Sequence, residues 1–253
     1  MAWREEDHPR DDDGKFTDGN GTYRQNSLEP YKASSKPLSL KLPDEQLPHS
    51  VGNSTSHREF TDAKSVDDFF FYDDEHRGLL AKRNSSYGRW ERNLTSHQRY
   101  VLDDYTSDGY SNINSYLRGY NNGEKYSIDY VKGEIAALDK AIEEFELREP
   151  IVTYRSINSD AFWENLDDIT ALIGTEYSDP AFMSTSPTKD SKALNKDLLM
   201  TIKLPKGKGI GAYIDQYNGL EEKEFLLARG SQFKITNART SNGKYYLEME
   251  LIR

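Results

Sequence analysis

The chain has 253 residues, of which 35% are hydrophobic, and this is enough for one sizeable core; we expect one globular domain with a tail. Its formal net charge of −10 argues against a general nucleic-acid surface, because nonspecific binding depends on lysine and arginine neutralising phosphates. Cysteine is absent, which excludes disulfides, thiolate nucleophiles and cysteine-bound zinc.

The first sixty residues mix Pro, Ser, Asn, Gly and both charge signs without a helical or strand period, so we predict that 1–60 is disordered or extended. Within it, the segment His8–Thr17 is similar to stretches of phage minor head proteins. A solvated acidic linker is the other interpretation of that segment. The remainder, 61–253, is predicted to be the globular domain.

Helices are predicted in the first half of that domain. Thr95-Ser96-His97-Gln98 is typical of a helix start. Tyr110, Ile113 and Leu117 are spaced as one buried stripe of a helix that Gly119 would end. Apolar residues from Ile128 to Phe145 recur every three or four positions, which predicts a longer helix.

After Pro150 the apolar period changes to two, which indicates strands. We predict them at 151–156, 181–186, 198–204, 210–215, 224–228, 232–235 and 245–252, with a hairpin turn at Asn242-Gly243. A helix is predicted over 160–173, capped by Ser159 or Asp160. Helices followed by strands predict an α+β fold.

Glu222 and Glu224 are two residues apart, so in an extended chain both side chains would point to the same side. They precede the apolar run Phe225-Leu226-Leu227, where charge is costly unless it is paired or functional. Taken alone, the pair is also compatible with a solvated acidic turn that leads into a strand.

Three segments occur in a fixed order: Tyr154-Arg155-Ser156, Phe182-Met183-Ser184-Thr185-Ser186 and Glu222-Lys223-Glu224-Phe225-Leu226-Leu227. Together they resemble the Arg, Ser-Thr-Ser and Glu-x-Glu signature of mono-ADP-ribosyltransferases, which move ADP-ribose from NAD to a protein side chain. The resemblance implies a mixed two-sheet core, with the two sheets perpendicular, after the N-terminal helices.

The resemblance also implies roles for the acids. Glu224 would stabilise the positive charge that builds on the ribose as the nicotinamide bond breaks, and Glu222 would orient or deprotonate the acceptor. In the family, a glutamate at the first acid accompanies arginine acceptors, so an arginine of a target protein is expected to be modified.

The other expected site residues follow from the same resemblance. Arg155 would bind the NAD pyrophosphate, because its planar fork donates several charge-assisted hydrogen bonds. Ser184 would hydrogen-bond the catalytic glutamate, and Ser156, Thr185 and Ser186 would shape the NAD site. Asn114 and Arg118, spaced i and i+4, match a family segment whose side chains contact the adenosine and phosphates of NAD.

We therefore expect an NAD-dependent, arginine-specific protein ADP-ribosyltransferase. Its expected partners are NAD and an acceptor protein, with no metal, nucleic acid or membrane, and the chain is expected to be a monomer. The alternatives are an NAD glycohydrolase and a phage head-associated protein with a non-catalytic transferase-like domain. The start of the chain lacks a secretory signal pattern. We expect it in the bacterial cytoplasm, in a phage particle, or exported by a dedicated machine.

Overall fold

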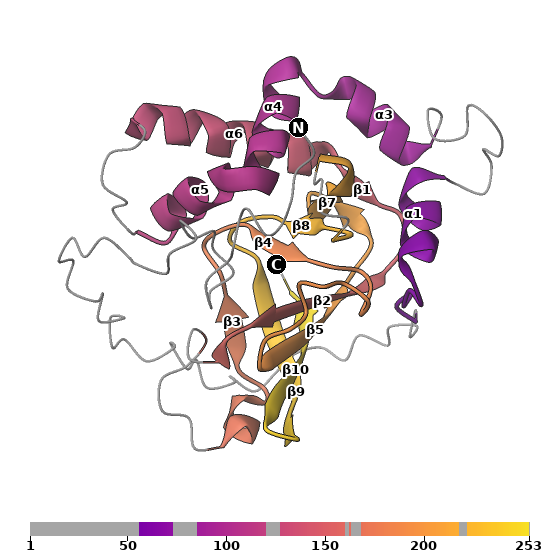
Figure 1. Cartoon of the computed structure of the whole chain (residues 1–253), viewed down its shortest axis with the longest axis vertical. Helices are drawn as coiled ribbons and strands as arrows, with labels where there is room; N and C mark the ends of the chain where they lie inside the picture. Colours follow the sequence, from indigo (N-terminus) through magenta and orange to yellow (C-terminus); the bar gives the residue numbers. More distant parts are fainter. Residues whose placement is uncertain are drawn as a thin grey trace, which may run out of the picture. The chain divides into compact units, whose positions relative to one another are not determined.

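Helices occupy the first part of the domain and strands the second (Figure 1). The computed structural model describes residues 56–72, 85–119, 127–159, 162, 168–217 and 222–252. The helices are α1 (Ala63–Phe71), α3 (Ser86–Asn93), α4 (Ser96–Asp104), α5 (Tyr110–Leu117) and α6 (Ile128–Glu144), with a π-helical turn η2 (Tyr105–Gly109) between α4 and α5. The predicted order of α+β elements is confirmed.

The helix ends follow local sequence signals. Thr95 accepts from the backbone N–H of Gln98, whose side chain accepts in return from the Thr95 N–H, so the predicted start of α4 is confirmed. Gly119, with φ of 79°, follows the end of α5 as predicted. The π-helical turn was not predicted, because a single inserted residue leaves no change in the apolar period that a short window reveals.

The strands form three sheets in the described part of the chain. A five-stranded sheet has the order β2-β5-β10-β9-β3, a three-stranded sheet the order β4-β8-β7, and β1 pairs with β6. All neighbours are antiparallel except β5 and β10. The bounds are β1 (Glu146–Leu147), β2 (Ile151–Ile157), β3 (Glu176–Ser178), β4 (Met183–Thr185), β5 (Leu198–Leu204), β6 (Gly207–Lys208), β7 (Gly211–Tyr213), β8 (Phe225–Leu227), β9 (Gln232–Ser241) and β10 (Lys244–Leu251).

The predicted hairpin turn is confirmed: Asn242 and Gly243 have φ of 52° and 73° and join β9 to β10. β9 continues to Ser241, six residues past the predicted end, because pairing with β10 stabilises its outer half, where Ala238 alone is buried. The short strand β3 was not predicted, since its three residues are mostly exposed and pairing with β9 alone makes them a strand.

The helix predicted over 160–173 is wrong in its described part. Residues 168–173 contain only a 3-10 helix, η4 (Ile169–Leu172), whose N-cap is Asp168. Ser159 donates its hydroxyl to Asp197 at 2.6 Å, and this bond ties it to the segment before β5. Residues 160, 161 and 163–167 lie outside the described residues.

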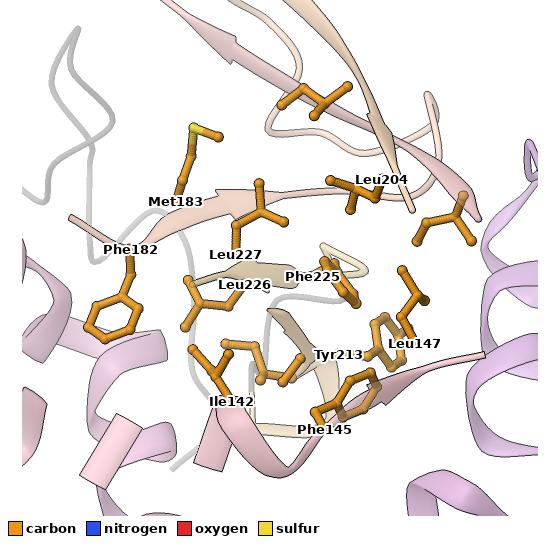
Figure 2. Close-up of a cluster of buried hydrophobic side chains, with 14 of the residues drawn as sticks. Ile142, Phe145, Leu147, Phe182, Met183, Leu204, Tyr213, Phe225, Leu226 and Leu227 are labelled. Carbon is orange, nitrogen blue, oxygen red and sulfur yellow. The ribbon is translucent and has the colours of Figure 1, made fainter. Parts of the chain in front are cut away.

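The three-stranded sheet lies between the helices and the five-stranded sheet (Figure 1). All three residues of β8 are buried, and Leu226 points toward Ile142 of α6, whereas Leu227 and Met183 point away from that helix (Figure 2). A Cβ on Gly211 of β7 would lie 2.5 Å from the carbonyl oxygen of Leu226, so only glycine allows this approach of the two strands. The buried strand β8 therefore fixes where the acids before it emerge.

Residues ahead of α1 also pair with the core. Arg58 forms a bridge with Ile151, and Phe60 forms one with Thr188. By its internal contacts, Ser56–Arg253 is one compact unit, so residues 56–60 of the predicted N-terminal segment belong to it. The segment His8–Thr17 and the rest of 1–55 lie outside the described residues. None of the helices described is long and apolar enough to cross a membrane.

Candidate active site

The strand β4 brings the three signature segments together. Arg155, on β2, donates from Nη1 to the carbonyl oxygen of Ser184 at 2.7 Å. Tyr154 and Ser186 exchange two backbone hydrogen bonds of 2.7 and 2.8 Å, which join the five-stranded sheet to the end of β4. On its other side β4 pairs with β8, directly after the two acids. Segments far apart in the sequence thus meet on one strand.

Two hydroxyls of the Ser-Thr-Ser segment bind the backbone on either side of Glu224. Ser186 donates to the carbonyl oxygen of Glu222 at 3.0 Å, and Thr185 donates to that of Phe225 at 2.8 Å. Both hydroxyl residues are buried. Their side chains therefore orient the acid segment through its main chain.

The sequence argument for the direction of the two acids is wrong in its premise. It assumed an extended chain from Glu222 to Glu224, but Lys223 between them has φ of 56°, in the left-handed region. β8 begins only at Phe225. The relative direction of the acids is therefore set by a turn and its contacts, and strand alternation does not apply.

Glu224 itself is buried, with 6% of its surface exposed. Its backbone N–H donates to Asp215 Oδ1 at 3.2 Å, and its carbonyl oxygen accepts from the N–H of Ile214 at 2.9 Å. Both backbone groups of the expected catalytic residue are thereby bonded to the segment after β7. A carboxylate placed this way is well suited to stabilise a positive charge without reorganisation.

Tyr105, on the π-helical turn, is a site residue that the sequence analysis missed. Its hydroxyl accepts from Asn114 Nδ2 at 3.0 Å and is also hydrogen-bonded to Ser184. Burial, followed by the charge of Glu224, raises the pKa of this phenol well above its usual value, so it stays protonated. A single Tyr carries no sequence signal for such a place, since most buried tyrosines are only packed.

Asn114 has one amide atom that no described residue contacts by a hydrogen bond. Its side chain is buried and Nδ2 donates to Tyr105, while Oδ1 has no hydrogen-bond partner in the part of the chain that the structure describes. A buried acceptor left unpaired is unfavourable unless a ligand supplies the donor. This atom therefore fits the predicted contact of Asn114 with a nucleotide.

Arg118 follows the last residue of α5 and forms a two-pronged ion pair with Asp179, at 3.2 Å from Nε and 2.7 Å from Nη2. Burial lowers the pKa of this guanidinium, but the hydrogen bonds and charge of Asp179 outweigh it, and the net change is upward. Asp179 also accepts from the N–H of Ala181, just ahead of β4. Arg118 is thus oriented toward the same strand as Arg155.

Tyr177, on β3, lies close enough to both Arg155 and Arg118 for their charges to act on its phenol. Burial and then the charge of Asp179 raise the pKa of its phenol to about 12, against the opposing effects of Arg155 and Arg118. Tyr105 likewise interacts with Arg118 and with Arg155. The two cationic side chains therefore interact with the same two tyrosines, and Glu224 interacts with one of them, Tyr105.

Ser156 has a different contact from the other predicted residues. Its hydroxyl accepts from the backbone N–H of Lys196 at 2.7 Å, so it anchors the loop that follows the Ser-Thr-Ser segment.

Among the described residues, no cluster of three His, Asp or Glu side chains is arranged to hold a metal ion. The arrangement thus consists of cationic groups that suit a pyrophosphate and acids that suit a developing positive charge.

The chain is similar to known proteins over this region. The family model of the ADP-ribosyltransferase exoenzymes matches residues 82–252. A curated relative, "NAD(+)--arginine ADP-ribosyltransferase EFV" of Enterococcus faecalis, is 33% identical over 158 residues, or 58% of this chain. That match spans only 30% of the relative's length.

Solved structures share the fold at lower identity. The Plx2a toxin of Paenibacillus larvae superposes with a TM-score of 0.61 and 21% identity, covering 76% of this chain and 98% of that one. The C3 exoenzyme of Clostridium limosum gives 0.63 and 17% over 78% and 98% of the two chains. The signature segments are joined on β4, and the family model matches residues 82–252, which is more than half of the chain. The chain therefore belongs to the ADP-ribosyltransferase exoenzyme family.

Proposed function

We propose that this protein is a mono-ADP-ribosyltransferase that moves ADP-ribose from NAD to an arginine side chain of a target protein. The observation that carries the proposal is the convergence of Arg155, Ser184 and the Glu222–Glu224 turn on β4. The name of the Enterococcus faecalis relative, an NAD(+)--arginine ADP-ribosyltransferase, supports the arginine acceptor.

In the proposed reaction, Arg155 and Arg118 bind the phosphates of NAD, and Asn114 Oδ1 accepts a hydrogen bond from the nucleotide. The bond between ribose and nicotinamide breaks, and its electron pair leaves with the nicotinamide. Glu224 stabilises the cationic ribose, and a nitrogen of the acceptor guanidine then bonds to the anomeric carbon. Glu222 takes the proton that this nitrogen loses.

The buried position of Glu224 supports this division of roles, because a fixed charge acts most strongly where water is excluded. Tyr105, protonated and bonded to Ser184, adds a polar group beside it that does not carry a competing negative charge. Ser184 would thus orient Glu224, and the hydrogen bond with Tyr105 would hold Ser184 in place.

The substrates of the proposed enzyme are NAD and a protein, and we propose that it acts as a monomer without nucleic acid, membrane or metal. Its place of action, whether bacterial cytoplasm, phage particle or a host reached by a dedicated export machine, stays a prediction. Size-exclusion chromatography with light scattering checks the monomer, with an expected mass close to 29.1 kDa.

The test uses labelled NAD with agmatine or polyarginine, and it follows nicotinamide release and label transfer separately. Wild type is expected to do both, whereas Glu222→Gln keeps release and loses transfer to arginine. Release by the wild type without transfer to any arginine acceptor favours the glycohydrolase alternative. Absence of release contradicts the proposal altogether.

A further inference from the structure

Lys223, the residue between the two acids, makes contacts that the charged run Glu221-Glu222-Lys223-Glu224 does not suggest. Lys223 has only 13% of its side chain exposed, and its Nζ lies 3.1 Å from Asp67 Oδ2 and 3.0 Å from Asp215 Oδ2. Burial lowers the pKa of this ammonium, but the two carboxylates raise it more, so the group stays charged. Lys223 is therefore fixed between two acids on the side of the turn that faces α1.

Both partners are themselves bonded in the described structure. Asp215 accepts from Lys223 with Oδ2 and from the backbone N–H of Glu224 with Oδ1, so it joins the lysine to the catalytic residue. Asp67 accepts from Lys223 with Oδ2 and from the hydroxyl of Tyr213 with Oδ1, at 2.7 Å. The network thus extends from α1 to the main chain of Glu224.

α1 is itself attached firmly. Phe70, three residues after Asp67, stacks on Tyr213 with ring centroids 4.2 Å apart and planes 10° apart. Phe70 and Phe69 are both buried. Asp67 is therefore presented by a packed helix, although α1 lies ahead of residue 82, where the match to the family model begins.

The backbone at Lys223 supplies an independent reason to expect a role. A lysine with φ of 56° adopts the left-handed conformation that side chains with a Cβ disfavour, and such residues persist where the surroundings determine the conformation. Here the surroundings are the two carboxylates that bind Nζ. Without the ammonium, Asp67 and Asp215 would repel each other next to Glu222 and Glu224.

We propose that Lys223 is a positioning residue, and that α1, through Asp67, fixes the turn that carries the two catalytic acids. The part of this inference that concerns turnover rests on the proposed function; the part that concerns the order of the turn does not. Lys223 touches neither β2 nor Arg155 in this network, so its loss is expected to alter turnover more than NAD binding.

The experiment compares Lys223→Met, Asp67→Asn, the double variant and Lys223→Arg. Asp68→Asn is the matched control, since Asp68 is the next residue of α1 and binds only the exposed Lys64 in the contacts described. Each protein is measured for kcat and KM for NAD by nicotinamide release, and for amide deuterium exchange in peptides covering 222–228.

We expect Lys223→Met to lower kcat about tenfold or more, because small displacements of catalytic groups have effects of this size. Asp67→Asn is expected to lower kcat about threefold to fivefold, with KM within about twofold of wild type in both variants. The double variant should lose no more turnover than Lys223→Met, since both changes remove the same ion pair and Asp67→Asn also removes the repulsion between Asp67 and Asp215. Lys223→Arg, which keeps the charge, should restore most of the turnover. Exchange at the Glu224 amide should be faster in the first three variants.

The inference is overturned if Asp67→Asn behaves like Asp68→Asn in both measurements, or if the effects of Asp67→Asn and Lys223→Met on kcat simply multiply. It is also overturned if kcat per folded enzyme is unchanged while only the melting temperature falls. If the wild type releases no nicotinamide, the proposed function fails, and the exchange measurement alone decides whether α1 orders the turn.

Discussion

The strand side and the helix side of the site are built in different ways. On the strand side, Arg155, Ser184 and Glu224 are placed by main-chain pairing of β2, β4 and β8 and the segments next to them. On the helix side, Tyr105 and Arg118 are placed by side-chain contacts with Asn114, Ser184 and Asp179. We infer that changes on the strand side act on chemistry or on the fold as a whole, whereas changes on the helix side act on orientation.

The largest effect is expected on the strand side, from Glu224→Gln. The variant keeps the shape of the side chain but removes its charge, and loss of a group that stabilises transition-state charge lowers turnover by about 10²–10³-fold. Nicotinamide release measures it, with Glu250→Gln, an exposed acid on β10, as the control. Unchanged turnover in Glu224→Gln would falsify the assignment of this acid.

The main-chain pairing itself is tested by Gly211→Ala. The added Cβ meets the carbonyl oxygen of Leu226 at 2.5 Å and the ring of Phe225 at 2.6 Å, so β7 and β8 must separate. We expect the free energy of unfolding to fall by about 1–3 kcal/mol, which is the usual cost of overpacking a core.

Gly133→Ala, on α6, is the matched control for Gly211→Ala, because no atom of another described element lies within 4 Å of the added methyl group. It should stabilise the protein by up to about 1 kcal/mol through helix propensity. Denaturant unfolding measures both variants. Equal stability of the two would contradict the close approach of β7 and β8.

On the helix side, Tyr105→Phe removes one hydroxyl and leaves Asn114 Nδ2 without that acceptor. We expect a loss of about 1–2 kcal/mol in unfolding free energy and a fall of a few-fold in kcat/KM for NAD. Tyr116→Phe, at an exposed position on α5, serves as the control and should change neither. A loss as large as that of Glu224→Gln would mean that Tyr105 takes part in the chemistry and does not only orient Asn114 and Ser184.

The smallest effect concerns Glu134 of α6, which is buried and whose Oε1 has no hydrogen-bond partner among the described residues. Burial raises the pKa of this carboxyl, as does Asp104, while Tyr130 and His97 lower it less. The folded protein thus binds the proton more tightly than the unfolded chain. Stability from this group is present below the ordinary pKa of a glutamate and is lost as pH rises through the higher pKa of the folded state.

We therefore expect Glu134→Gln to be more stable than wild type at pH 7, by about 1 kcal/mol in unfolding free energy, and to melt at a higher temperature. At pH 4 the two proteins should have the same stability. Melting curves across this range measure the difference. Glu143→Gln, which removes an exposed carboxylate from the same helix, is the control. A constant difference at all pH values would rule out titration of Glu134 as the cause.

The sequence by itself determined the α+β order, the strands that carry Arg155 and Ser184, and the turn at Asn242-Gly243. These features depend on local periods and turn preferences, which act over a few residues. The three signature segments also predicted which parts of the chain come together, and the structure joins them on β4.

Only the tertiary structure decided how the acids and the helix side are oriented. Lys223 contacts Asp67 across 156 positions of sequence, and Arg118 contacts Asp179 across 61. The left-handed backbone at Lys223, the place of Tyr105 and the strand β3 likewise depend on what packs against them. Such pairings follow from the packing of distant elements, and no pattern within one segment contains them.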